Sequence, residues 1–256
     1  MSATPISQKL LLKMQIPIKI GCSGWSYPEW RGKFYPQEAK SKDYFMHYVR
    51  YFNTVEINST FYHLPSMGTI KKWYEQAPTS FQYTLKVNRD ITHFKKFHEV
   101  KKAINDFYAL GEGLEEKLAH FLFQLPPSFN YSSENLERII TQLNSRYTNV
   151  IEFRHASWWR PEVFTAFESS NLIFCSVSGF NIPEELIVLA GKAYIRFHGD
   201  KTYGANYSDS QLALWFSKIK SCACEDFTAY FNNTRLGYAP YNALSLIGLL
   251  QSVSTS

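Results

Sequence analysis

Acidic and basic residues stand two positions apart at the ends of several short apolar segments. Glu152-Phe-Arg154 and Arg196-Phe-His198 are the clearest cases. Successive side chains of a β-strand point to opposite sides, so both members of each pair share one face. Carboxylates and imidazoles on one face can act as general bases and acids, and arginines can stabilise negative charge. The spacing therefore indicates a polar site built from strand ends.

These pairs belong to a regular alternation of predicted strands and helices, with no linker, repeat or low-complexity stretch. The predicted strands are Ile18–Cys22, Thr54–Ile57, Phe81–Val87, Phe121–Leu125, Val150–Phe153, Leu172–Val177, Ala193–Phe197 and Phe227–Phe231. The predicted helices are Asp43–Phe52, Met67–Gln76, Val100–Leu110, Ser133–Ser145, Pro161–Ser169, Ser210–Ser221 and Ala239–Leu250, with Ile182–Ala190 as a less distinct crossover.

Eight strand–helix units in about 250 residues predict an α/β protein with a single-domain (β/α)8 barrel of the TIM type. We expect residues 17–256 to form this domain, with the first and eighth strands paired, and residues 1–16 to be a flexible tail. An open doubly wound sheet would need a glycine-rich phosphate turn after its first strand. Gly21–Trp25 (GCSGW) lacks the required spacing.

The alternation of apolar residues predicts which side chains enter the barrel. Val55 and Ile57 should face the helices, and so should Ile151 and Phe153. Because strand residues alternate, the residues between and after them should point into the barrel. The predicted inward set is Glu56, Asn58, Thr84, Lys86, Glu152, Arg154, Arg196 and His198, with Ser23, Gln124, Ser176, Tyr230 and Asn232 assigned by the same rule. Every strand then ends in a polar inward residue, where barrel active sites are built.

The charges in this set admit two interpretations. Two carboxylates, Glu56 and Glu152, face three cations, Lys86, Arg154 and Arg196, which leaves one positive charge. Such a surplus, with planar arginine donors, suits a phosphate or carboxylate ligand. The alternative is a set of structural ion pairs.

Aromatic residues follow several strands. Trp25, Tyr27 and Trp30 come after the first strand, Phe61 and Tyr62 after the second, and Trp158 and Trp159 after the fifth. They would either stack on the rings of a ligand or pack the top of the barrel.

Composition narrows the class of protein. The 27 basic and 22 acidic residues give a net charge of +5, which permits a polyanionic partner without requiring one. The chain has four cysteines, and their spacing is not that of a zinc site. It has no apolar run long enough to cross a bilayer and no secretory h-region at its start. These features predict a protein of the reducing cytoplasm that is not bound to a membrane. The oligomeric state is not predicted.

Several motifs make the chain resemble one known family. They are GCSGWSYPEWRGKFYP from Gly21, VEINSTFYHLP from Val55, ITH from Ile91, FQLPPSF from Phe123, EFRHASW from Glu152, YIRFHG from Tyr194 and YFNNTRLGYAPYNAL from Tyr230. In this order they are similar to the YecE-like family, the proteins with domain of unknown function 72. The resemblance implies a TIM barrel and covers nearly all of the chain beyond residue 17. It implies no catalytic residues, because the function of the family is not established.

Three functions remain open. The first is an enzyme or binder acting on a phosphate-containing ligand, that is, a phosphodiester, nucleotide or nucleic acid; the enzyme would be a hydrolase. The second is a glycoside hydrolase, and the third is a nucleic-acid-binding module without catalysis. The predicted catalytic residues are Glu56, Glu152, His155 and His198, and the predicted ligand contacts are Ser23, Trp25, Tyr27, Asn58, Lys86, Arg154, Trp158, Arg196, Tyr230 and Asn232.

A divalent metal is a further possibility. Glu56, His93, Glu152, His155 and His198 offer oxygen and nitrogen ligands from several strand ends. The scarcity of inward aspartates and the absence of an HxH or HxD spacing argue against it.

Overall fold

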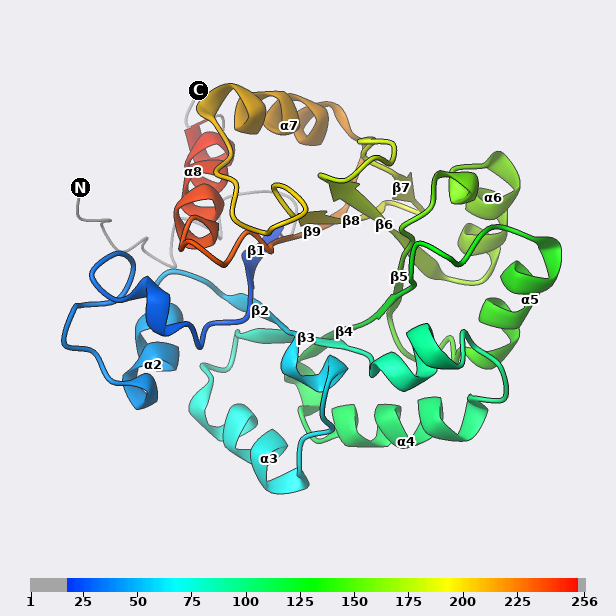
Figure 1. Cartoon of the computed structure of the whole chain (residues 1–256), viewed down its shortest axis with the longest axis horizontal. Helices are drawn as coiled ribbons and strands as arrows, with labels where there is room; N and C mark the ends of the chain where they lie inside the picture. Colours follow the sequence, from blue (N-terminus) through cyan, green and yellow to red (C-terminus); the bar gives the residue numbers. More distant parts are fainter. Residues whose placement is uncertain (1–17, 253–256) are drawn as a thin grey trace.

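The computed structural model describes residues 18–252, and they form a closed parallel barrel (Figure 1). Its eight parallel strands are β1 (Ile18–Ser23), β2 (Thr54–Ile57), β3 (Gln82–Lys86), β4 (Leu118–Gln124), β5 (Asn149–Glu152), β6 (Leu172–Ser178), β8 (Lys192–Phe197) and β9 (Asp226–Phe231). β1 pairs with β9 and β6 pairs with β8, so the ring has no open edge. The predicted (β/α)8 barrel and its closure are confirmed.

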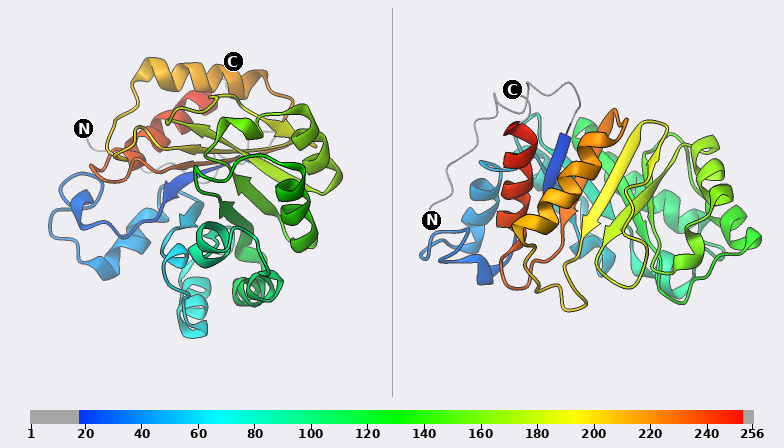
Figure 2. Two further views of the ribbon diagram at one scale, coloured as in Figure 1. Left: turned by 45° about the vertical axis from the view of Figure 1, so that its right-hand side comes forward. Right: turned by 90° about the horizontal axis from the view of Figure 1, so that it is seen from above.

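Helices cover the outside of the barrel, as both views in Figure 2 show. They are α2 (Tyr44–Tyr48), α3 (Met67–Gln76), α4 (Lys101–Glu112), α5 (Ser133–Gln142), α6 (Pro161–Ser169), α7 (Asp209–Ser221) and α8 (Ala239–Ser252). Short helical turns lie in the connections between strands and helices: η1 (Pro28–Trp30), η2 (Ser41–Asp43), η3 (Ser59–Phe61), η4 (Asp90–Phe94), η5 (Glu115–Lys117) and η6 (Ala156–Trp158). Serines cap α3, α5 and α7 by accepting a backbone N–H of the first turn.

The crossover between β6 and β8 contains no helix, so the prediction of a helix at Ile182–Ala190 is wrong. This segment forms β7 (Val188–Leu189), which is antiparallel to β8. The backbone N–H of Ile187 donates to Ser176 Oγ (2.8 Å). Pro183 removes one donor near the start of the segment, and the turn at Ala190 and Gly191 has positive φ at both residues. An extended segment at Ile182–Ala190, called the strap below, therefore takes the place of a helix between β6 and β8.

The predicted inward and outward faces are confirmed for β2 and β5. Val55, Ile57 and Ile151 lie in the apolar layer between barrel and helices, whereas Glu56 and Glu152 are buried inside the barrel. The face predicted for β6 is wrong. Its inward residues are Ile173, Cys175 and Val177, which form an apolar cluster with Leu122, Val150, Tyr194 and Tyr230.

Ser176 consequently faces outward, where its hydroxyl holds the strap that follows β6. One wall of the barrel interior is therefore apolar up to the strand end. The polar inward residues come from the other strands.

The described residues contain no helix that is long and apolar enough to cross a membrane. The tail expected at residues 1–16 lies outside the described part of the chain, as do residue 17 and residues 253–256.

Candidate functional site

Arg196 is the centre of the charged barrel interior. Its Nη2 atom donates to Glu56 Oε1 and its Nη1 atom donates to Glu152 Oε2, and both donor–acceptor distances are 2.6 Å. All three side chains are fully buried. They come from β2, β5 and β8, so one guanidinium joins strands from different parts of the ring. Two carboxylates on one planar cation form a charge-assisted network of high geometric specificity.

Neighbouring hydroxyls complete the shell around Glu56. Ser23 Oγ donates to Glu56 Oε1 (2.7 Å) and the Tyr194 hydroxyl donates to Glu56 Oε2 (3.0 Å). Both carboxylate oxygens are thus satisfied without water. The predicted contact residue Ser23 therefore orients Glu56.

The network extends toward the mouth of the barrel through Arg154 and His198. Arg154 Nε donates to Glu152 Oε1, and His198 Nε2 lies 3.3 Å from the same oxygen. On the other side of the imidazole, Asn232 Nδ2 lies 3.0 Å from His198 Nδ1. When Asn232 donates to Nδ1, the imidazole proton is on Nε2, where Glu152 accepts it.

The electrostatics keep Glu152 ionised and His198 neutral. Burial alone would raise the pKa of the Glu152 carboxyl, but Arg154 and Arg196 hold it well below its usual range. Burial, followed by Arg154, lowers the pKa of His198 well below its usual value. Glu152 therefore acts as a fixed negative charge and not as a proton donor at neutral pH.

Lys86 is set apart from this balanced network. Two arginines neutralise the two glutamates, so the surplus cation expected from the sequence is Lys86 at the end of β3. It is 8% exposed, and its Nζ atom lies 4.1 Å from the centroid of the Phe61 ring. Within residues 18–252 this Nζ atom forms no ion pair or hydrogen bond. Burial and then Arg196 lower its pKa to about 7.

Lys86 borders a cavity of about 440 Å³ at the carboxyl end of the strands. Three of the other predicted ligand contacts, Tyr27, Asn58 and Asn232, also line this cavity. The remaining lining residues are Glu29, Tyr62, Thr202, Tyr203, Thr234 and Arg235. Asn58 Oδ1 is buried and has no hydrogen-bond partner among the described residues. The hydrogen-bonding capacity of this oxygen is therefore unused within residues 18–252.

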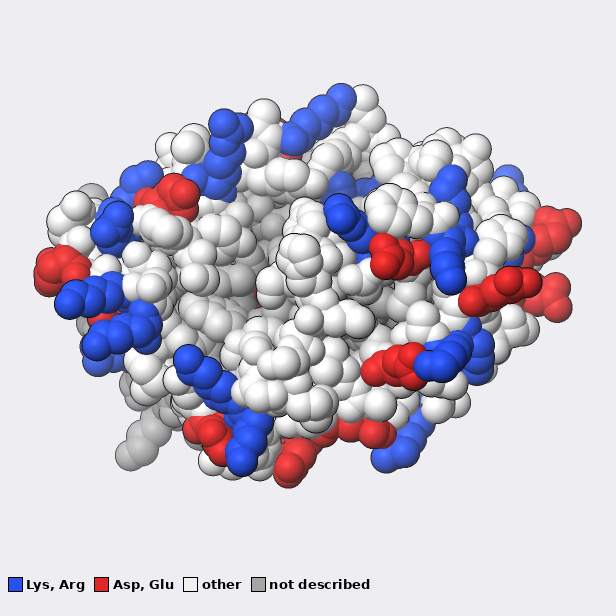
Figure 3. Space-filling view, turned by 60° about the horizontal axis from the view of Figure 1, so that its bottom comes forward, with Lys and Arg blue, Asp and Glu red and all other residues white. Residues whose placement is uncertain are grey.

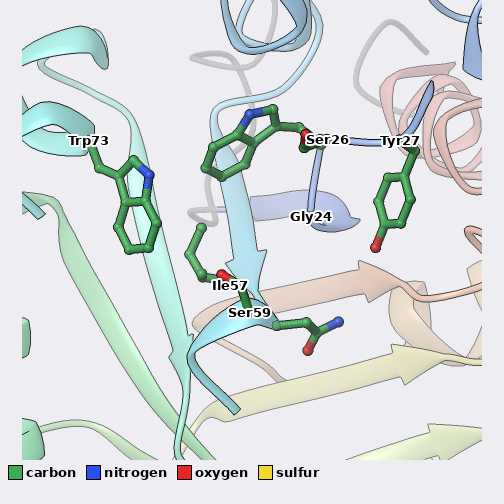
Figure 4. A pocket seen from close by; sticks show the side chains of 8 residues that line it. Gly24, Ser26, Tyr27, Ile57, Ser59 and Trp73 are labelled. Atoms are coloured by element: carbon green, nitrogen blue, oxygen red, sulfur yellow. The ribbon is translucent and has the colours of Figure 1, made fainter. Parts of the chain in front are cut away.

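A second hollow of about 200 Å³ adjoins this cavity, since Tyr27 and Asn58 line both. Figure 4 shows Trp73 and Tyr27 on opposite sides of it, with Ile57 and Ser59 between them. Trp25 also lines it and packs edge-on against Trp73 with ring centroids 6.3 Å apart. Flat apolar walls of this kind fit a planar ring.

Three further predicted site residues lie outside both cavities and outside the charged network. Trp158 is fully buried, stacks on Phe153 with centroids 4.0 Å apart, and donates its Nε1–H to Phe129 O. His155 caps the turn η6 by accepting the backbone N–H of Ser157. Tyr230 is fully buried inside the barrel, where its hydroxyl forms hydrogen bonds with Thr54 Oγ1 (2.5 Å) and Thr84 Oγ1 (3.0 Å).

Strand alternation did not indicate Arg235 or Trp73, each of which lines one of the cavities. The signal for Arg235 is its position in the motif YFNNTR, in the loop directly after the last strand. Trp73 is on α3, where the alternation of strand residues gives no signal. Only the folded chain brings it to Trp25.

The proposed metal ligands do not converge. Residues 18–252 contain no group of three His, Cys, Asp or Glu side chains placed to hold a metal ion. His93 contacts the Phe61 ring edge-on, and burial followed by Lys86 lowers its pKa to about 4. His155 binds its own turn instead of pointing to Glu152.

The closed ring of eight parallel strands, with polar residues and a cavity at its carboxyl end, defines a TIM-barrel protein. The chain belongs to the family described as "Protein of unknown function DUF72", whose model matches residues 19–256. The resemblance to the YecE-like family is thereby confirmed.

Relatives from two bacteria are consistent with this assignment. The UPF0759 protein YunF of Bacillus subtilis is 25% identical over 273 residues, which cover 91% of this chain and 94% of YunF. The UPF0759 protein YecE of Escherichia coli K12 is also 25% identical, over 56% of this chain and 50% of YecE.

Solved structures share the barrel. A DUF72 family protein from Thermotoga maritima superposes with a TM-score of 0.83 at 28% identity and covers 92% of this chain and 99% of its own. PbGH5A, a glycoside hydrolase family 5 enzyme from Prevotella bryantii, superposes with a TM-score of 0.50 at 11% identity, over 99% of this chain and all of its own. At this identity the latter shows a common fold alone.

Proposed function

We propose that this protein binds a small phosphate-containing ligand in the cavity at the carboxyl end of the barrel. The observation that carries the proposal is that Lys86 and Arg235 both line this cavity without forming an ion pair in residues 18–252. A phosphate group accepts charge-assisted hydrogen bonds from just such cations. A volume of about 440 Å³ lies within the usual range for small-molecule sites.

Each lining group has a role in this proposal. Lys86 at the base and Arg235 at the rim contact the phosphate, while the amides of Asn58 and Asn232 orient the rest of the ligand. A ring attached to the phosphate enters the neighbouring hollow beside Trp73. A nucleotide or another phosphorylated ring compound has this shape.

The buried arginines have a different role from the one expected from the sequence. Arg196 is fully buried and bonded to two carboxylates, and Arg154 is bonded to Glu152. We therefore assign them to the structural network and assign phosphate contact to the two unpaired cations.

The same geometry makes the other two functions less suitable. Glu56 and Glu152 are buried, bind one arginine and line neither cavity, so they do not flank a space for a sugar. On the face drawn in Figure 3, basic and acidic side chains are interspersed and form no continuous basic track. A long nucleic acid would need such a track.

Calorimetric titration at low salt tests the proposal with inorganic phosphate, a nucleoside monophosphate and a neutral oligosaccharide. We expect the phosphates to bind, and Lys86→Met and Arg235→Met each to weaken binding by about ten- to a hundredfold. Lys71→Met is the matched control, because Lys71 is exposed on α3 and pairs with Glu75. Binding of the oligosaccharide alone, with no effect of salt, would contradict the proposal.

A further inference from the structure

Two lysines within residues 18–252 are buried, and their surroundings are opposite. Lys117 donates from Nζ to Tyr74 O (2.7 Å) and Ala77 O (2.8 Å), so its ammonium group is held by two carbonyls. Lys86 is equally buried, but its Nζ atom has no such acceptor among the described residues and lies against the Phe61 ring. A buried lysine with only a structural role would have hydrogen-bond acceptors for its ammonium group, as Lys117 has.

The groups around Lys86 decide the state of its amine. Burial and the cations Arg196 and Arg154 disfavour the ammonium form, while Glu152 and Glu56 favour it, and the resulting pKa is about 7. The nearby His93 is neutral at this pH, because burial followed by Lys86 lowers its pKa to about 4. Near pH 7 about half of the Lys86 side chains therefore carry a free lone pair, against less than about 0.1% for an ordinary lysine.

We propose that Lys86 is a nucleophile that condenses with the carbonyl carbon of a small phosphorylated aldehyde or ketone in the cavity. The neutral amine attacks the carbonyl carbon and forms a C–N bond. The carbonyl oxygen then leaves as water with the two amine protons, and a C=N bond remains. The step is balanced without an oxidant, a reductant or a further reactant.

The cavity supplies places for the rest of such a ligand. Arg235 at the rim holds the phosphate, a part of the argument that rests on the proposed function. The side-chain amide of Asn58, which lines the cavity, forms a hydrogen bond with a hydroxyl next to the reacting carbon. Phe61 shields one side of the amine from water and leaves the cavity side open.

Reductive trapping tests the inference. The protein is incubated at pH 7 with glyceraldehyde 3-phosphate or glyceraldehyde and sodium cyanoborohydride, and the modified lysine is located by peptide mass spectrometry. We expect glyceraldehyde 3-phosphate to label Lys86 about tenfold or more faster than the exposed Lys71, and glyceraldehyde to label it more slowly. Lys86→Met should lose the adduct, and Lys71→Met should keep it.

Lys86→Arg separates this inference from the proposed function, because it retains a cation that binds phosphate but has no nucleophilic amine. It should bind inorganic phosphate and form no adduct. Labelling of Lys86 no faster than of Lys71 would overturn the inference while leaving phosphate binding intact. Equal labelling of Lys86 by both aldehydes would instead overturn the requirement for phosphate. The wild-type peptide map gives the result even when a variant fails to fold.

Discussion

The Nη2 atom of Arg196 lies 2.6 Å from Glu56 Oε1, although the two residues are 140 positions apart in the chain. The contact joins β8 to β2 through the inside of the barrel, and the other amino group of Arg196 reaches Glu152 on β5. Arg196, Glu56 and Glu152 therefore form a structural link across the barrel, which we call the brace. The ligand-binding capacity that we propose lies above it, on Lys86.

Removal of this brace should destabilise the protein strongly. Arg196→Met leaves Glu56 buried without its only ion-pair partner among the described residues and removes one of the two guanidiniums from Glu152. We expect the free energy of unfolding to fall by about 3–5 kcal/mol, as for other broken buried ion pairs. Urea denaturation measures it, with Lys71→Met as a surface control. A loss below about 0.5 kcal/mol would show that the brace is dispensable.

Lys86→Met should stabilise the protein at neutral pH. The pKa of Lys86 is about 7 in the folded state and about 10.4 in the unfolded chain, so between these values the unfolded chain binds more protons. The free energy of unfolding of the wild type therefore rises with pH across this window. Below the window, protonation of the buried Lys86 lowers the free energy of unfolding.

We expect Lys86→Met to raise the free energy of unfolding by about 2–4 kcal/mol at pH 7. The gain should shrink as pH approaches 10. Thermal denaturation of both proteins at pH 7 and pH 9.5 measures the difference. A variant that is less stable than the wild type at pH 7 would contradict the depressed pKa.

Anion affinity should decrease as pH rises, because Lys86 loses its proton. Sulfate is a suitable probe, since its own charge is constant over this range. Between pH 6 and pH 9 we expect sulfate affinity to fall by about tenfold in the wild type. Lys86→Arg should remove the pH dependence, and calorimetric titration compares the two. The same decrease in both proteins would assign it to another group.

Tyr230→Phe should affect stability and not binding. The Tyr230 hydroxyl is bonded to Thr54 and Thr84 deep in the barrel, so its removal should lower the free energy of unfolding by about 0.5–1.5 kcal/mol. Phosphate affinity should stay within twofold of the wild type. A tenfold loss of affinity would instead restore Tyr230 as a ligand contact.

Local patterns were sufficient to predict most of the barrel. Strand alternation is a property of the backbone, so the apolar neighbours Val55 and Ile57 were enough to turn Glu56 inward. The same rule failed at Ser176, because β6 is apolar on both faces and its alternation carries no information. The helix predicted after β6 failed because pairing of the strap with β8 outweighed a weak helical pattern.

The sequence by itself determined which charges enter the barrel and at which end they lie, since both follow from strand parity and parallel order. Only the tertiary structure decided their partners. Arg196 lies between Glu56 and Glu152 because closure brings β2, β5 and β8 around one axis. That contact leaves Lys86 as the unpaired cation of the predicted inward set. The pairing of these charges depends on distances across the barrel. Strand register and barrel closure determine those distances, and no local pattern in the sequence contains them.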